Sequence, residues 1–249
     1  MNKRISVIGM SLAQLCSLNV EFFHGELLSN EEFDYIFETC PQAFWLRDNS
    51  NPLNPHTALT AGGCSNGFVN TLQVLSYANL CYILAYHMAV RVRQVWPGPV
   101  DWVVGSDHAG AVFSQNVALF FPGARHDFTT KVPKSGDIAE RQIWNRFTIG
   151  KEEWVLRIEE LMTTGTTNDR VVAGIGEFHT EYPINYIPVI GICVNRSGMV
   201  EYKDSVLVSN RDYDITSYSR PEVCQWCKDG SPRIENPKQN WGKLKSISI

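Results

Sequence analysis

Residues 154–167 narrow the range of folds open to this chain more than any other segment. An apolar run ends in two acids, Glu159 and Glu160, and then breaks into a loop of hydroxyl residues around Gly165. This order predicts a buried strand, a tight turn and a helix that begins at Thr166. Such a turn gathers backbone N–H groups, threonine hydroxyls and a helix N-terminus around one point, which suits a phosphate monoester.

The two acids add a second kind of chemistry to this loop. Carboxylates that precede an anion-binding turn can hold the hydroxyls of a sugar or the water on a magnesium ion. The combination therefore favours a ribose 5-phosphate group as the ligand. The alternative is an ordinary strand, turn and helix with a threonine-rich N-cap, and the local residues leave both interpretations open.

The size and charge of the chain limit the classes of function. A chain of 249 residues can bury one substantial core, most simply as a single domain with extensions. Its net charge of −4, with no run of lysines, argues against a nucleic-acid partner. No apolar stretch is as long as a membrane span, and Gln14 interrupts the N-terminal apolar patch too early for a signal peptide. We therefore expect no membrane association.

The cysteines indicate a reducing compartment. The seven cysteines are an odd number, and Cys16, Cys81 and Cys193 each lie alone in apolar surroundings, so we expect reduced thiols and a cytoplasmic protein. Cys224 and Cys227 form a Cys-x-x-Cys pair. A structural zinc site needs four ligands, and the sequence offers no second pair and only scattered histidines. We expect no metal site, and interpret the pair as packing the C-terminal segment.

Strands and helices are expected to alternate from residue 100 onward. The patterns predict strands at 102–105, 125–131, 154–161 and 187–195, with helices at 109–120 and 166–176. This alternation predicts an α/β fold, a parallel sheet covered by helices, with ligands at the carboxyl ends of the strands. Two further helices are expected, one at 71–96 and a shorter one at 30–40 with Asn30 as its N-cap.

A second candidate anion-binding loop joins the first of these strands to its helix. It contains Gly105, Ser106, Asp107, His108, Ala109 and Gly110. Its glycines let the backbone approach an anion, and the start of the helix supplies partial positive charge. Asp107 would repel pyrophosphate unless it binds a metal or points away, and it is equally suited to capping the following helix.

Segment 154–167 resembles the phosphoribosyl-diphosphate (PRPP) motif of the type I phosphoribosyltransferases: a hydrophobic strand, two acids, two small or hydroxyl residues, Gly and a hydroxyl. One departure is the second acid, usually Asp and here Glu160. Loop 105–110 resembles the pyrophosphate loop of that family. Further segments resemble those of orotate phosphoribosyltransferases in the same order: 59–70, 124–131, 145–149, 191–198 and the Cys-x-x-Cys tail at 221–230.

The resemblance runs from about Thr57 to Lys238 and implies a fold. It implies the type I phosphoribosyltransferase fold: a central, mainly parallel sheet flanked by helices, with a small hood built from N-terminal and C-terminal residues. We expect an N-terminal extension that includes part of the hood at 1–60, the transferase core at 61–210 and a C-terminal segment packed on the hood at 211–249.

The resemblance also implies an activity. It implies a glycosyltransferase that moves the 5-phosphoribosyl group of PRPP to orotate, giving orotidine 5′-phosphate and pyrophosphate for pyrimidine nucleotide biosynthesis. Mg²⁺ bound through PRPP and a homodimer are implied as well. The alternatives are a transferase for another base, or a non-catalytic protein on the same fold that senses PRPP or a nucleotide.

Residue roles follow from the matched motifs. The residues implied in catalysis are Lys131, Glu159 and Glu160. PRPP is expected to contact loop 105–110, Arg146, both acids, Met162, Thr163, Thr164, Gly165, Thr166 and Thr167. The base is expected to contact Arg196, Thr163 and Phe68, and residues 131–146 to close as a lid. Arg196 is suited to a carboxylate through two parallel N–H···O bonds, but is also compatible with an ordinary surface arginine. Lys131 is equally compatible with a solvated side chain.

Overall fold

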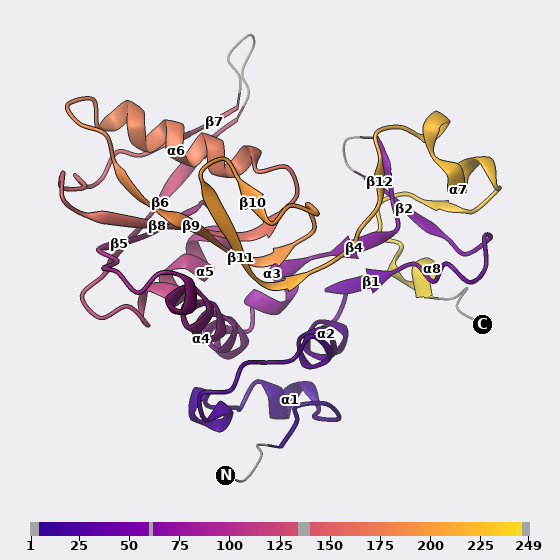
Figure 1. Ribbon diagram of the computed structural model, residues 1–249. Coiled ribbons are helices and arrows are strands. Elements are labelled where there is room, and N and C mark those ends of the chain that lie inside the picture. Colours follow the sequence, from indigo (N-terminus) through magenta and orange to yellow (C-terminus); the bar gives the residue numbers. More distant parts are fainter. Residues whose placement is uncertain (1–4, 60–61, 134–139, 246–249) are drawn as a thin grey trace.

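The computed structural model describes residues 5–59, 62–133 and 140–245. Its largest sheet has seven strands in the order β10-β11-β9-β8-β5-β6-β7 (Figure 1). Their bounds are β5 Trp102–Ser106, β6 Arg125–Val132, β7 Arg141–Ile143, β8 Trp154–Met162, β9 Asn185–Asn195, β10 Glu201–Tyr202 and β11 Ser205–Asp212. The inner strands β11, β9, β8, β5 and β6 pair in parallel, and both edge strands are antiparallel. The predicted mainly parallel sheet is confirmed.

Helices cover both faces of this sheet. Helices α4 (Ala78–Val95) and α5 (Ala109–Ala118) lie on one face, and α6 (Thr166–Phe178) lies on the other (Figure 1). Successive residues of a strand point to opposite faces. Accordingly, Leu156 of β8 joins the large core with α4 and α5, whereas Val155 packs in a smaller core with Ile175 of α6. The predicted α/β layers are confirmed.

The helix expected at 71–96 is interrupted. It is divided into α3 (Thr71–Leu75) and α4, and Tyr77 between them is extended at φ −81° and ψ 101°. The Ser76 hydroxyl donates to the Gln73 carbonyl at 3.1 Å. This local hydrogen bond competes with continuation of the helix, because serine offers the backbone an alternative partner.

The N-cap of the first long helix is also one residue earlier than expected. Helix α2 spans Asn30–Thr39, and Ser29 caps it instead of Asn30. The Ser29 hydroxyl accepts from the Glu32 N–H at 3.2 Å, and the Glu32 carboxylate accepts from the Ser29 N–H at 3.0 Å. This reciprocal capping box satisfies two backbone donors, whereas a cap at Asn30 would satisfy one.

The N-terminal residues complete the core on the α4 side. Helices α1 (Leu12–Leu15), η1 (Val20–Phe23) and α2 lie beside α4, and Phe23 is fully buried against the ring of His87. Asp34 of α2 accepts two hydrogen bonds of 2.8 Å from Arg211 of β11. None of the helices in the described residues combines the length and apolar character needed to span a bilayer.

A smaller sheet lies beside the carboxyl ends of the central strands (Figure 1). It has the order β12-β3-β2-β13, with β2 His56–Ala58, β3 Cys64–Ser65, β12 Ser217–Tyr218 and β13 Arg233–Ile234. Strands β1 (Phe44–Leu46) and β4 (Gly67–Val69) form a ribbon next to it, and η2 (Pro221–Val223), α7 (Gln225–Lys228) and α8 (Trp241–Lys245) cover it. We call this sheet with its ribbon and C-terminal helices the hood. It joins early and late parts of the chain, and its strands β3 and β4 lie within 61–210, the range expected for the transferase core.

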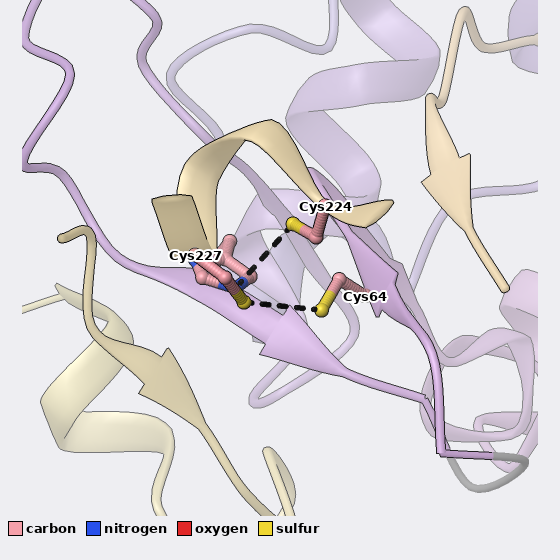
Figure 2. Close-up of side chains that lie close together, drawn as sticks. Cys64, Cys224 and Cys227 are labelled. Carbon is pink, nitrogen blue, oxygen red and sulfur yellow. Dashed lines mark hydrogen bonds between the residues drawn. The ribbon is translucent and has the colours of Figure 1, made fainter. Parts of the chain in front are cut away.

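The expectation that Cys224 and Cys227 lack further metal ligands is wrong. Cys64 and His56 lie beside the pair, and the four ligand atoms all lie within 4.8 Å of one another. Figure 2 shows the three cysteine side chains converging between the hood sheet and α7. The sequence spacing hides this cluster, because two of its members come from strands far from the pair in the chain.

Candidate active site

The turn between β8 and α6 has the geometry expected of an anion-binding loop. Gly165 adopts a left-handed conformation at φ 77°, and a Cβ added there would lie 2.4 Å from the Tyr202 ring. Thr163, Thr164 and Thr166 are exposed. Gly165, the N-cap of α6, has no side chain with which to cap the helix, and in the first turn the N–H of Asn168 is bonded to the Glu159 carboxylate. The N–H groups of Thr166 and Thr167 lie at the turn, with threonine hydroxyls beside them.

The two acids of β8 point to opposite faces of the sheet. Glu159 lies on the α6 face and is only 5% exposed, and its carboxylate accepts the backbone N–H of Asn168. Within the described residues, Glu159 Oε1 has no hydrogen-bond partner. Burial, followed by the charge of Glu160, raises the pKa of Glu159 to about 8. The carboxyl group is therefore largely neutral at pH 7 without a ligand.

Glu160 faces the β5–α5 turn. Its Oε2 lies 3.1 Å from the position that a Cβ on Gly110 would occupy. Burial raises the pKa of Glu160, the charge of Asp107 raises it further, and His108 lowers it. The carboxyl groups of Glu160 and Asp107 are therefore close to one another near the start of α5. The two acids of β8, Glu159 and Glu160, are both present as expected but lie on opposite faces of the sheet.

The β5–α5 turn requires its glycines. A Cβ on Gly105 would lie 2.5 Å from the Gly110 carbonyl oxygen, and a Cβ on Gly110 would lie 2.7 Å from the Ser106 hydroxyl. The N-cap of α5 is His108, which is exposed and has a positive φ of 59°. A non-glycine residue in that conformation is strained, and such strain often marks a binding loop.

Asp107 does not cap α5. Its Oδ2 accepts the backbone N–H of Lys131 at 3.0 Å, and its Oδ1 accepts from Gln142 Nε2 at 3.4 Å. The carboxylate therefore ties the turn to β6 and β7. Of the roles that the sequence left open for Asp107, capping of α5 is therefore excluded.

The basic residues expected around the pyrophosphate are already paired. Lys131 Nζ lies 2.8 Å from Glu140 Oε2, and Arg146 donates through Nε to both oxygens of buried Asp127 at 2.9 Å. The structure does not bring these two cations to the open turn. The centre of the expected lid, including Lys134, lies outside the described residues.

Unlike Lys131 and Arg146, Arg196 lies next to the threonine turn. It follows β9, and its backbone N–H donates to the Met162 carbonyl at 3.0 Å, next to the threonine turn. Its side chain is half-buried, which lowers the pKa of the guanidinium. Among residues 5–59, 62–133 and 140–245, no side-chain hydrogen bond or ion pair engages that guanidinium. A cation in this state favours an anionic ligand.

Of the three residues expected to contact the base, Arg196 and Phe68 line the same cavity, whereas Thr163 is not among its lining residues. The cavity has a volume of about 380 Å³. Its other lining residues come from the hood: Ala58, Leu59, Gly67, Val69, Asn236, Pro237, Lys238 and Gln239. Lys238 is an exposed second cation that the sequence analysis did not include among the site residues. No local pattern pointed to it, because the C-terminal segment folds back across the cavity.

Tyr202 is a further site residue that the sequence analysis missed. Its ring packs on Gly165, and its hydroxyl donates to Asp169 Oδ2 at 2.9 Å. Lys203 Nζ reaches Asp169 Oδ1 at 2.6 Å. The β10–β11 hairpin therefore braces the start of α6 from one side. The requirement for glycine at 165 was the available signal, but it does not reveal which side chain packs there.

The chain is similar to curated proteins of one kind, although no family model matches it. It is 26% identical over 189 residues to the orotate phosphoribosyltransferase of Heliobacterium modesticaldum, covering 76% of this chain and 92% of the relative. It is 27% identical over 188 residues to that of Desulforamulus reducens, covering 74% and 88%. Among solved structures, the orotate phosphoribosyltransferase of Mycobacterium tuberculosis matches with a TM-score of 0.46 and 12% identity, over 72% of this chain and 95% of that one.

Proposed function

We propose that this protein, which has the type I phosphoribosyltransferase fold and resembles orotate phosphoribosyltransferases, transfers the 5-phosphoribosyl group of PRPP to orotate. The products are orotidine 5′-phosphate and pyrophosphate, as in pyrimidine nucleotide biosynthesis. Its named relatives, aligned over most of their own length, support a phosphoribosyltransferase. The choice of orotate rests on the chemistry of one cavity.

Arg196 is the residue from which we infer that the base is orotate. Its half-buried guanidinium, which has no side-chain partner among the described residues, faces a cavity of about 380 Å³ that Phe68 also lines. A planar base that bears a carboxylate satisfies both groups, since the guanidinium accepts a carboxylate through two parallel hydrogen bonds and the ring contacts the base. Exposed Lys238 adds a second positive charge. Bases without a carboxylate would leave Arg196 unpaired.

The threonine turn is proposed to hold the 5-phosphate of PRPP. Its exposed hydroxyls at Thr163, Thr164 and Thr166 stand beside the start of α6, where the N-cap residue is Gly165. Because Arg196 N–H is bonded to Met162, the base cavity and this turn are adjacent. The ribose would span the two, with Glu159 and Glu160 directly before the turn on β8.

Mg²⁺ enters the proposal as part of the substrate, bound to the diphosphate of PRPP. The residues at the start of α5 fit such an ion, because Glu160 and Asp107 are oxygen donors; the pKa of Glu160 is raised first by burial and then by repulsion from Asp107. A cation between the diphosphate and these carboxylates would relieve that repulsion. When bound, the ion neutralises charge on the leaving pyrophosphate.

The reaction needs no covalent intermediate with the protein. A nitrogen of the base forms a bond to the anomeric carbon while the bond to the pyrophosphate oxygen breaks. The electron pair leaves with pyrophosphate, and the proton of that nitrogen is released to water. The chain then contributes position and charge: Arg196 orients the base, the threonine turn fixes the phosphate, and the buried carboxyl of Glu159 lies close to the developing positive charge. We propose that ionisation of Glu159 accompanies binding of the cationic sugar centre.

A second candidate is a protein that binds PRPP without turning it over. The pairing of Lys131 with Glu140 and of Arg146 with Asp127 favours it, since these cations are then not directed at pyrophosphate. Glu160, longer than the usual Asp, favours it as well. A transferase for another base is the third candidate, and it is disfavoured because no described residue pairs with the Arg196 guanidinium.

One assay separates these candidates. The loss of orotate absorbance is followed in the presence of PRPP and Mg²⁺, with each omitted in turn. The proposal requires a loss that needs both and that releases one pyrophosphate per orotate consumed. Calorimetric binding of PRPP with no turnover of orotate or of any purine or pyrimidine base identifies the sensor instead.

We also propose a cytoplasmic homodimer. Its support is the resemblance to the transferases together with the cysteines, all seven of which are free thiols. Light scattering of the purified chain tests the oligomeric state: a mass of one chain at micromolar concentration contradicts the dimer.

A further inference from the structure

We propose that one zinc ion binds where the C-terminal segment meets the hood sheet, held by four side chains: His56, Cys64, Cys224 and Cys227. The Sγ atoms of Cys64 and Cys227 lie 3.7 Å apart. His56 Nε2 lies 3.2 Å from Cys227 Sγ and 3.9 Å from Cys224 Sγ. In a tetrahedral zinc site with bonds of about 2.0–2.3 Å, ligand atoms are separated by about 3.4–3.8 Å. These three separations lie near this range, and the remaining pairs of ligand atoms are within 4.8 Å of one another.

The local backbone explains why these four side chains converge. In the hood sheet Ala58 pairs directly with Cys64, so their side chains share one face. His56 lies two residues before Ala58 and therefore points to the same face. Cys224 is the N-cap of α7 and Cys227 lies within that helix, one turn further on. The short helix lays both thiols against that face of the sheet (Figure 2).

Hydrogen bonds select the form of His56 that binds a metal. The Ser231 hydroxyl donates to the Asn54 carbonyl at 2.6 Å, so it faces His56 Nδ1, 2.8 Å away, with a lone pair. The ring proton is therefore expected on Nδ1, and the lone pair of Nε2 points at the cysteines. Zinc-binding histidines are commonly fixed in this way through the ring nitrogen that does not bind the metal.

Burial and charge also suit a zinc ion. His56, Cys64 and Cys224 are fully buried, and water therefore does not compete for their ligand atoms. Three thiolates and a neutral imidazole around Zn²⁺ carry one net negative charge. The Arg233 side chain is within hydrogen-bonding reach of Cys64, and the charge of buried Arg47 acts on His56. Arg233 is also paired with Glu235, so the loaded site, the two arginines and this glutamate together carry no net charge.

The hood has a small apolar cluster of its own. Within the residues that the structure describes, it contains three buried side chains, Trp45, Ile234 and Leu244, with Phe68 and Trp241 packed against them. Small units with so few buried apolar groups commonly depend on a metal or disulfides. A zinc ion would join β2 and β3 to the C-terminal segment, and that segment also lines the cavity of Arg196.

The test measures zinc in the full chain purified under reducing conditions. We expect about one zinc per chain by mass spectrometry of the metal. In competition with a graded series of chelators, Cys64→Ser and Cys227→Ser should each lose zinc at least tenfold more easily. Cys16→Ser is the matched control, because Cys16 lies outside the cluster, and it should retain zinc like the unmodified chain.

A second measurement uses the unmodified chain and does not depend on how the variants fold. Replacement of zinc by Co²⁺ should give thiolate-to-metal charge-transfer absorption, and the metal should protect Cys64, Cys224 and Cys227 from alkylation. Chelation should remove this protection, while Cys16 reacts equally in both states. The proposal is overturned if the folded chain binds neither ion, if both serine variants keep zinc as tightly, or if Cys64 and Cys227 are joined as a disulfide.

Discussion

The backbone N–H of Arg196 donates to the carbonyl of Met162 at 3.0 Å, which joins the end of β9 to the last residue of β8. The base-facing arginine and the threonine turn are therefore held at a fixed separation by the parallel ladder, in which Met162 pairs with Asn195. Ligands are expected at such adjacent carboxyl ends of parallel strands. Because the link uses main-chain atoms, the two functions can be separated by changing the Arg196 side chain.

Replacement of Arg196 by Ala should weaken orotate binding and leave PRPP binding nearly intact. The change removes a charged hydrogen-bond partner, which corresponds to roughly tenfold to a hundredfold in affinity. The alanine keeps the N–H that bonds to Met162, so PRPP affinity should change by less than about threefold. Titration calorimetry with each ligand measures both. Arg196→Lys is the control, and it should recover part of the affinity but not the two-bond geometry. Equal loss of both ligands contradicts the role.

Gly165→Ala should damage the threonine turn. The new Cβ meets the Tyr202 ring at 2.4 Å and forces a left-handed conformation on alanine, which alone costs about 1–2 kcal/mol. We expect a lower unfolding midpoint in urea and at least tenfold weaker PRPP binding. Gly176→Ala is the matched control, because its Cβ would meet nothing within 4 Å in the same helix. That variant should be neutral or stabilised by up to about 1 kcal/mol.

Local patterns were sufficient to predict the strand, turn and helix around Gly165, since each signal lies within a few residues of the next. The sequence analysis could not predict that Arg146 is bound by Asp127 or that Tyr202 covers Gly165, because those partners lie on other elements. The zinc ligands were missed for the same reason. A Cys-x-x-Cys pair reveals two ligands, and only the pairing of β2 with β3 brings the other two to it.

Stability should decrease between about pH 5 and pH 8 because of Glu159. Its pKa is about 8 in the folded chain against an ordinary value of 4.5, so in this window the folded state holds a proton that the unfolded state has lost. The free energy of unfolding therefore falls as pH rises, by roughly 3–5 kcal/mol from this group alone. Glu159→Gln should remove that part of the slope in urea unfolding at several pH values. Exposed Glu181→Gln should leave it unchanged.

Asp107→Asn should raise the Mg²⁺ concentration needed for PRPP binding. Asparagine still accepts the Lys131 N–H, so the turn should keep its shape while one of the two negative charges that face α5 is lost. One partly screened charge at this range is worth about 1 kcal/mol, or roughly fivefold in the half-saturating Mg²⁺ concentration. PRPP titrations at a series of Mg²⁺ concentrations measure it, with exposed Glu152→Gln as the control. An unchanged requirement would exclude Asp107 from the ion's surroundings.

Removal of the zinc proposed for the hood should loosen the hood before the central sheet. The cluster joins His56 and Cys64 to α7, whereas β5, β8 and β9 are held by their own parallel ladders and two apolar cores. Hydrogen exchange measured by mass spectrometry should therefore accelerate at 56–65 and 217–234 after chelation, and stay slow in these three strands. Orotate binding should weaken more than PRPP binding, since the hood lines the Arg196 cavity and the threonine turn lies on the central sheet. Uniform acceleration over the whole chain would instead mean that the ion supports the entire fold, and unchanged exchange would mean that the hood does not depend on it.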